Sequence, residues 1–210
     1  MKTLLFLGDS ITDCNHCFEP KNLGFGYVRM IHEALNSQNT QYQIINKGND
    51  GFTVPSVCRL YKNTCTAFSP DLITLLVGIN DLAVIQNTGI TETVGLADFR
   101  LRYQALIDQI RNTFHGPVVL MEPFIFPHPA EYSSWEPTLL EMNGIIRNLA
   151  VQNDLFFLPL MEMLKQNASL VGISSITTDG IHLTSRGHQL IADQWLQNLP
   201  KFLPHSLPPF

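Results

Sequence analysis

The sequence predicts an α/β fold, a five-stranded parallel sheet with helices on both faces. Short apolar runs alternate with longer amphipathic segments five times along the chain, as in successive strand–helix units. The short runs are rich in Leu, Ile, Val and Phe, as expected of strands that are buried on both faces. With 210 residues, 45% of them hydrophobic, the chain is long and apolar enough for one domain with a sizeable core.

The expected elements follow this alternation in order. The strands are expected at residues 3–7, 43–46, 71–77, 117–121 and 155–158. The helices are expected at residues 24–35, 54–64, 98–114, 134–151 and 185–199. The clearest helix is 98–114, where apolar side chains recur on one face with a period of 3.6 residues. We expect a single domain at 1–199. Because proline interrupts helices, the prolines after position 199 predict a proline-rich, non-helical tail at 200–210.

Composition and charge argue against some classes of binding partner and favour others. The chain has 13 Lys and Arg against 18 Asp and Glu, and it contains no basic run, which argues against nucleic acid. Charged residues make up only 15%, and this shortage favours a homo-oligomer. No segment approaches the ~18 apolar residues of a membrane span. The N-terminal apolar run stops at Gly8-Asp9 without a cleavage site, which predicts a first strand and a cytoplasmic location rather than a signal peptide.

The four cysteines do not form a recognisable metal site. Cys14 and Cys17 have the C-x-x-C spacing of redox and zinc sites, but Cys58 and Cys65 are separated by six residues. A closed zinc site usually has two tight pairs. We therefore expect free thiols and no metal, and the role of Cys14 and Cys17 stays open.

Candidate reactive groups follow the first strand and precede the last helix. Ligands of parallel sheets bind beyond the carboxyl ends of the strands. Ser10, at a strand-to-helix turn, is placed either as a nucleophile or as a helix N-cap. Asp179 lies three residues before His182 and is placed to orient its imidazole as a general base; the alternative is a capping aspartate and a surface histidine.

Two residues after the second and third strands suit the binding of an oxyanion. A glycine such as Gly51 lets a backbone N–H approach a ligand closely. The Asn80 side chain can donate a hydrogen bond to a developing negative charge. Glycine and asparagine are also frequent in turns, which is the alternative for both.

Taken together, these segments resemble the SGNH, or GDSL, hydrolases. The matching motifs occur in the family's order: Gly8-Asp9-Ser10-Ile11, then Gly51, then Gly78-Ile79-Asn80-Asp81, then Asp179-Gly180-Ile181-His182. Gly48 is the alternative to Gly51. We prefer Gly51 because it directly precedes the next helical segment, as the family's glycine does. The resemblance implies a three-layer α/β/α, flavodoxin-like fold.

The resemblance also implies the role of each residue. Ser10 is expected to attack an ester carbonyl, and His182, oriented by Asp179, to take the serine proton. The oxyanion hole is expected to comprise the N–H groups of Ser10 and Gly51 and the side chain of Asn80. This chemistry needs no cofactor.

Four further stretches, 5–13, 23–28, 77–81 and 120–124, resemble the acetylxylan-esterase-like branch. The implied function is a serine esterase that hydrolyses short-chain esters through an acyl-enzyme and removes acetyl groups from carbohydrates. The expected substrate is a small-molecule or oligosaccharide ester. Lysophospholipase or arylesterase activity, a non-catalytic sugar-binding module and a flavodoxin-like nucleotide binder are the alternatives, since one fold supports several functions. Phe124, Phe126 and Trp135 are expected either to wall the substrate site or to pack within their loop.

Overall fold

Five parallel strands form the sheet, as predicted. The computed structural model describes residues 1–37 and 42–204. The strands are β1 (Lys2–Gly8), β2 (Tyr42–Gly48), β3 (Leu72–Leu76), β4 (Val118–Met121) and β5 (Phe156–Leu158). Each lies within two residues of the range expected from the sequence, because the apolar runs that form the strands are the buried segments themselves.

The strands pair in the order β2-β1-β3-β4-β5, so β1 lies between β2 and β3. The carboxyl end of β1 meets its neighbours in register: Gly8 lies opposite Gly48 of β2 and Leu76 of β3. In this flavodoxin-like order the connections leave in opposite directions from β1 and β3, and ligands of such sheets bind at that point. The loops after β1 and β3 are therefore the first place to look for a site.

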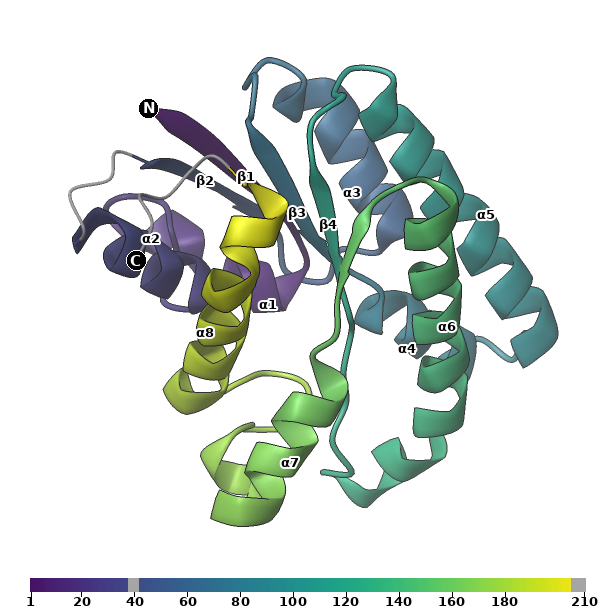
Figure 1. The fold of residues 1–210 in the computed structure, drawn as a ribbon. Helices are drawn as coiled ribbons and strands as arrows, with labels where there is room; N and C mark the ends of the chain where they lie inside the picture. Colours follow the sequence, from purple (N-terminus) through teal and green to yellow (C-terminus); the bar gives the residue numbers. More distant parts are fainter. Residues whose placement is uncertain (38–41, 205–210) are drawn as a thin grey trace.

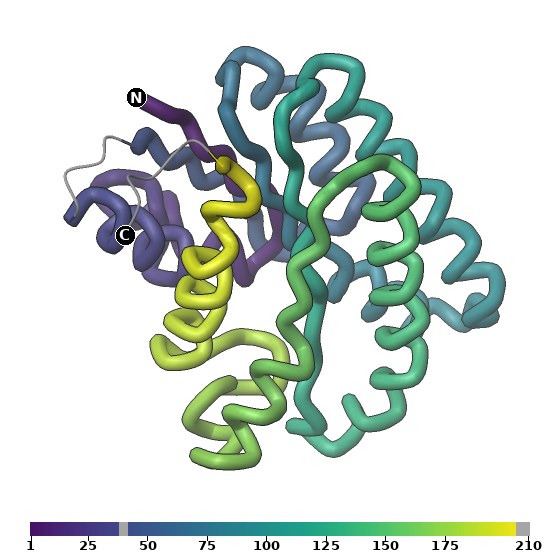
Figure 2. The backbone as a smooth tube through the Cα atoms, viewed as in Figure 1, coloured from purple at the N-terminus to yellow at the C-terminus, as the bar shows by residue number. Residues whose placement is uncertain are grey.

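Helices cover both faces of the sheet (Figure 1). The α-helices are α1 (Ser10–Asp13), α2 (Tyr27–Ser37), α3 (Val54–Leu60), α4 (Ile79–Asn87), α5 (Glu92–Arg111), α6 (Glu136–Gln152), α7 (Met161–Val171) and α8 (Ser185–Phe202). Helices α2 and α8 pack together on one face, and α3, α5 and α6 cover the other. The result is a three-layer α/β/α domain, whose backbone Figure 2 draws as a tube in the same view.

The core is continuous across the three layers. All five residues of β3 are buried, and so are Leu4–Leu7 of β1. The fully buried Trp195 of α8 spans from the helix layer to the sheet, where its indole N–H donates to the Thr74 hydroxyl at 3.1 Å. This bond satisfies both polar groups in an otherwise apolar interior.

Several helical segments differ from the expectation, among them α5, which begins at Glu92 rather than at residue 98. Helices α4 and α7 were not expected, because α4 begins within the Gly78–Asp81 motif and α7 is short. The non-helical tail is expected from residue 200, but α8 continues through Pro200 to Phe202. The physical reason is packing: Phe202 is 4% exposed and its ring lies against Trp195 and Phe156, which offsets the hydrogen bond that proline cannot donate. The rest of that tail, 205–210, lies outside the described residues.

Within the described ranges, none of the helices combines the length and the apolar character needed to cross a bilayer.

Candidate active site

Ser10 is the first residue of α1, directly beyond the carboxyl end of β1. The N-cap of this helix is Asp9, not Ser10: the Asp9 carboxylate accepts the Ile11 N–H at 3.0 Å. The capping alternative for Ser10 is therefore wrong, and its hydroxyl is free for another partner. That partner is His182, whose Nε2 lies 3.0 Å from Ser10 Oγ.

Asp179 and His182 form a tight turn before α8. The Asp179 carboxylate contacts His182 Nδ1 at 2.6 Å and accepts the His182 N–H at 2.7 Å. Between them, Gly180 has a φ of 94°, and a Cβ there would lie 2.0 Å from the His128 carbonyl oxygen. Only glycine fits this turn. The loop after β4 also holds it, because the Phe126 N–H donates to the Gly180 carbonyl at 2.9 Å.

These contacts form one chain from carboxylate to imidazole to hydroxyl. A carboxylate on Nδ1 stabilises the tautomer with its proton on Nδ1, which leaves Nε2 free to accept the serine proton. Partial burial raises the pKa of Asp179, but hydrogen bonds from the His182 ring and from the N–H groups of His182 and Ile181 lower it more, and the net shift is downward. Asp179 therefore stays ionised and holds the imidazole in this orientation.

The structure distinguishes the two candidate glycines for an oxyanion hole. The Gly48 N–H is occupied by Asn46 Oδ1 at 2.9 Å, and a Cβ at Gly48 would lie 2.2 Å from the Asp13 nitrogen. Gly48 thus serves the close packing of β2 on α1. Gly51 lies in an exposed turn with a φ of 71°, and among the described residues neither its N–H nor that of Ser10 has an acceptor.

Asn80, in the first turn of α4, reaches the same turn. Its Nδ2 donates to the Phe52 carbonyl at 3.0 Å, which places the side chain beside the Gly51–Phe52 segment. The amide carries two N–H donors, so one remains for a ligand. The next residue, Asp81, accepts the Val54 N–H with both carboxylate oxygens, at 3.2 and 3.0 Å, and so holds the start of α3.

A cavity of about 310 Å³ opens beside Ser10. Its lining includes Ser10 and His182 together with Asp13, Asn15 and Asp50. A second, much smaller hollow has about 10 Å³ of free space and lies among the residues next to Ser10, Asn80 and His182 in sequence. Its lining is mainly apolar: Asp9, Ile11, Leu76, Ile79, Pro123, Phe124 and Ile181.

Comparison with known proteins identifies the family. The model of the GDSL-like Lipase/Acylhydrolase family matches residues 6–190. The chain belongs to this family. Its membership, and the acetylxylan esterase among its relatives, make it a serine-type carboxylic ester hydrolase and confirm the resemblance seen in the sequence motifs.

Individual relatives of this GDSL hydrolase agree with the fold. An acetylxylan esterase of Geobacillus stearothermophilus is 23% identical over 206 residues, which cover 93% of each chain. The crystal structure of that esterase has a TM-score of 0.82, with 94% of both chains covered. A structure from Parabacteroides merdae described as a GDSL-like lipase has a TM-score of 0.79 at 28% identity, covering 93% of this chain and 94% of that one.

Two buried carboxylates lie beneath the site of this GDSL hydrolase. Burial raises the pKa of both Asp9 and Asp81 to about 7, although each accepts a backbone hydrogen bond that lowers it. The charge of Asp81 raises the pKa of Asp9 further. Sequence analysis did not single out either carboxylate as perturbed, because nothing in the motif letters gives the depth of burial.

His188 lines the large cavity but is held as a neutral group. Burial lowers its pKa to about 4. Its Nδ1 accepts the Tyr27 N–H at 3.3 Å, so the ring proton is on Nε2, which faces Cys14 Sγ at 3.5 Å. His188 therefore connects α8 to α2 and to the loop after α1.

Of the two alternatives for the aromatic residues after β4, a substrate wall or packing within the loop, the structure shows packing. Phe124 and Phe126 are 3% and 2% exposed, and their rings pack edge to face with centroids 6.4 Å apart. Trp135 is half-buried against Tyr132. These side chains pack within the loop because burying a large aromatic surface is favourable. Phe124 also lines the small hollow, together with Ile11, Ile79 and Ile181.

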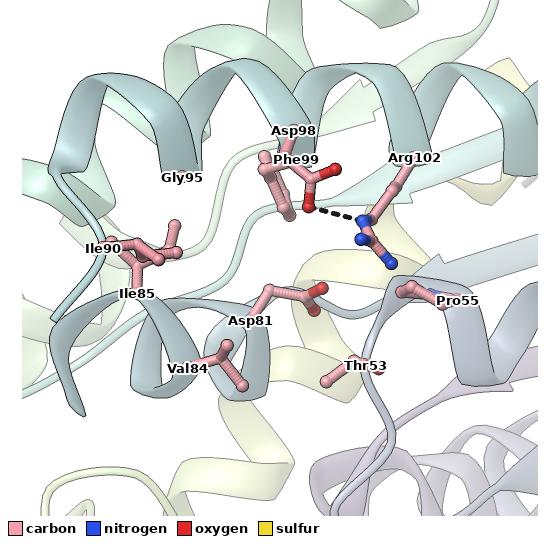
Figure 3. Close-up of a pocket in the computed structure, with 10 residues that line it drawn as sticks. All are labelled: Thr53, Pro55, Asp81, Val84, Ile85, Ile90, Gly95, Asp98, Phe99 and Arg102. Carbon is pink, nitrogen blue, oxygen red and sulfur yellow. Dashed lines mark hydrogen bonds and ion pairs between the residues drawn. The ribbon is translucent and has the colours of Figure 1, made fainter. Parts of the chain in front are cut away.

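A separate cavity of about 180 Å³ lies between α4, α5 and the start of α3 (Figure 3). Asp81 points into it, and an Asp98–Arg102 ion pair lies along its α5 side. Ser10, Asp179 and His182 do not line it. Its connection to the site is Asp81, the neighbour of Asn80.

The thiols lie at different depths. All four cysteines are free; Cys17 is exposed, Cys65 is buried, and Cys14 and Cys58 are intermediate. Within residues 1–37 and 42–204, no three His, Cys, Asp or Glu side chains are grouped as metal ligands.

Proposed function

We propose that this GDSL hydrolase cleaves short-chain carboxylic esters through an acyl-enzyme on Ser10, and that acetylated carbohydrates are its substrates. The observation that carries the mechanism is the hydrogen-bonded chain from Asp179 through His182 to Ser10. The deacetylase assignment is supported by the relative that is named acetylxylan esterase. The solved structures of that relative include catalytic mutants in which a serine, an aspartate or a histidine is replaced by alanine.

In the first half-reaction, Ser10 Oγ attacks the ester carbonyl as His182 Nε2 takes the hydroxyl proton. The carbonyl oxygen becomes an oxyanion, which the N–H groups of Ser10 and Gly51 and the free N–H of Asn80 stabilise. His182 then donates its proton to the leaving alcohol, and the acyl group stays on Ser10. Asp179 stabilises the imidazolium in between.

In the second half-reaction, water replaces the alcohol. His182 removes a proton from the water, which attacks the acyl carbonyl, and the same donors hold the oxyanion. Collapse of this intermediate releases the carboxylic acid and returns the proton to Ser10 Oγ. Pre-positioned donors of this kind contribute roughly 3 kcal/mol each to the transition state.

The test is Ser10→Ala, assayed on p-nitrophenyl acetate and on acetylated xylo-oligosaccharides. We expect kcat/KM to fall by about a thousandfold or more, because the nucleophile is lost while the fold is kept. Ser169→Ala, on the exposed face of α7, is the matched control and should retain activity. Retention of more than about a tenth of wild-type kcat/KM in Ser10→Ala would exclude Ser10 as the nucleophile. Hydrolysis of lysophospholipids in preference to acetylated sugars would exclude the carbohydrate assignment.

A further inference from the structure

The cavity of about 310 Å³ beside Ser10 is lined by His182, the residue that must give a proton to the leaving alcohol. The alkoxide receives its proton from His182 Nε2, so the alcohol portion of the ester has to lie on the His182 side of Ser10. The acyl carbonyl, by contrast, points to Asn80 and Gly51. Ser10, His182 and Leu183 line the cavity of about 310 Å³, and Asn80 does not line it.

The lining of this cavity is acidic. Asp13 and Asp50 both line it, together with Asn15. The Asp13 carboxylate is fixed in place, because it pairs with the His16 ring and accepts the Asp50 N–H at 3.2 Å. The Asp50 carboxylate has no hydrogen-bond or ion-pair partner among the described residues. Asp50 also directly precedes Gly51, so its position is tied to the proposed oxyanion hole.

No positive charge offsets these carboxylates in the cavity. Of the residues that line it in the described chain, none is Lys or Arg. His188 is neutral near pH 7, since burial lowers its pKa to about 4. Ionised carboxylates accept hydrogen bonds but donate none. A partner with hydroxyl or ammonium donors therefore gains charge-assisted hydrogen bonds here, and a partner with a negative charge is repelled.

We infer that this cavity is the subsite for the alcohol portion of the ester, and that Asp50 selects alcohols carrying hydroxyl or ammonium donors over alcohols carrying a negative charge. The inference rests on the proposed function, because it uses Ser10 and His182 to orient the substrate. It adds the substrate class: acetate esters of neutral or cationic polar alcohols, and not of acidic ones. Neutral sugars fall in this class and uronic acids do not.

The experiment compares two acetate esters that differ in the charge of the alcohol, acetylcholine and acetoxyacetate, with acetylated methyl glucoside as the neutral reference. The readout is the ratio of kcat/KM for acetoxyacetate to kcat/KM for acetylcholine, measured for the wild type, Asp50→Asn and Asp50→Lys. Charge reversal next to the substrate should raise this ratio by about tenfold or more, with Asp50→Asn in between. The effect should shrink at high salt, which screens an exposed charge.

Glu141→Lys, an exposed position on α6, is the control for net charge and should leave the ratio unchanged. A change in the ratio of less than about fivefold in Asp50→Lys, or an equal change in Glu141→Lys, overturns the inference. If Asp50→Lys does not fold, the ratio in Asp50→Asn decides, with at least about a twofold rise expected. Failure of the proposed function looks different, because Ser10→Ala would then still hydrolyse the esters.

Discussion

At the scale of single residues, the reactive side chains of the site depend on neighbouring residues for their position and their hydrogen-bond partners. Asp9 caps α1, so the Ser10 hydroxyl is available to His182. Gly180 permits the turn that brings the Asp179 carboxylate onto the His182 ring. The motif spacing predicted which residues meet. It did not show that Gly48 packs against α1 while Gly51 keeps a free N–H, because that difference depends on the register of β2 against β1.

The two histidines near Ser10 predict different mutant phenotypes. His182 contacts both the Ser10 hydroxyl and the Asp179 carboxylate, whereas His188 is buried and bonded to the Tyr27 backbone. We expect His182→Ala to lower kcat by about a hundredfold or more with little change in stability. His188→Ala should lower the free energy of unfolding by roughly 1–3 kcal/mol, because it leaves a buried N–H unpaired, with a much smaller loss of kcat. Steady-state kinetics and urea unfolding of both variants separate these effects, and a greater loss of kcat in His188→Ala would reverse the assignment.

At the scale of elements, strands were predictable and some helices were not. The strands are continuous apolar runs, and every residue of β3 is buried, so composition alone locates them. Helix α7 is harder to see, because its buried face consists only of Met161, Leu164 and Ala168. The end of α8 was missed because Pro200 argues locally for termination, whereas the contact of Phe202 with Trp195 comes from tertiary packing.

Asp81 joins β3 and α4 to the start of α3, and its burial predicts a pH dependence of stability. The carboxyl keeps its proton up to about pH 7 in the folded chain but releases it near 3.8 when unfolded. The folded state therefore binds more protons in this interval, and the free energy of unfolding contributed by Asp81 falls as pH rises from 3.8 to about 7. Asp9 acts in the same direction. His188, with its pKa lowered from 6.5 to about 4, acts in the opposite direction over that interval.

Asp81→Asn should remove the contribution of Asp81 to the free energy of unfolding, which falls as pH rises. The free energy of unfolding of the variant minus that of the wild type should therefore increase by roughly 1–3 kcal/mol from about pH 5 to pH 8. The side-chain amide oxygen can still accept the Val54 N–H, so the fold should survive. Urea unfolding at the two pH values measures this difference, with exposed Asp193→Asn as the control. An equal offset from the wild type at both pH values would mean that Asp81 stays ionised throughout.

At the scale of the whole molecule, the sheet order brings the loops after β1, β2 and β3 to one edge. Ser10, Gly51 and Asn80 come from these three loops, and the turn before α8 adds Asp179 and His182 from the far end of the chain. The loop after β4 lies at the same edge, and its Phe124 and Phe126 are buried. Helix α7 packs its apolar residues into the domain, so it is not a free apolar lid over the site.

This architecture predicts a preference for acetyl over longer acyl groups. With the alcohol on the His182 side, we expect the acyl chain to enter the hollow lined by Ile11, Ile79 and Phe124, which has only about 10 Å³ of free space. A methyl group needs little more than this, whereas each further methylene has to displace packed side chains, at a cost of roughly 1–3 kcal/mol. We expect kcat/KM to fall by about tenfold from p-nitrophenyl acetate to the butyrate and again to the octanoate. Phe124→Ala should enlarge the hollow and raise the butyrate-to-acetate ratio, whereas a maximum at octanoate in the wild type would show that the acyl chain lies elsewhere.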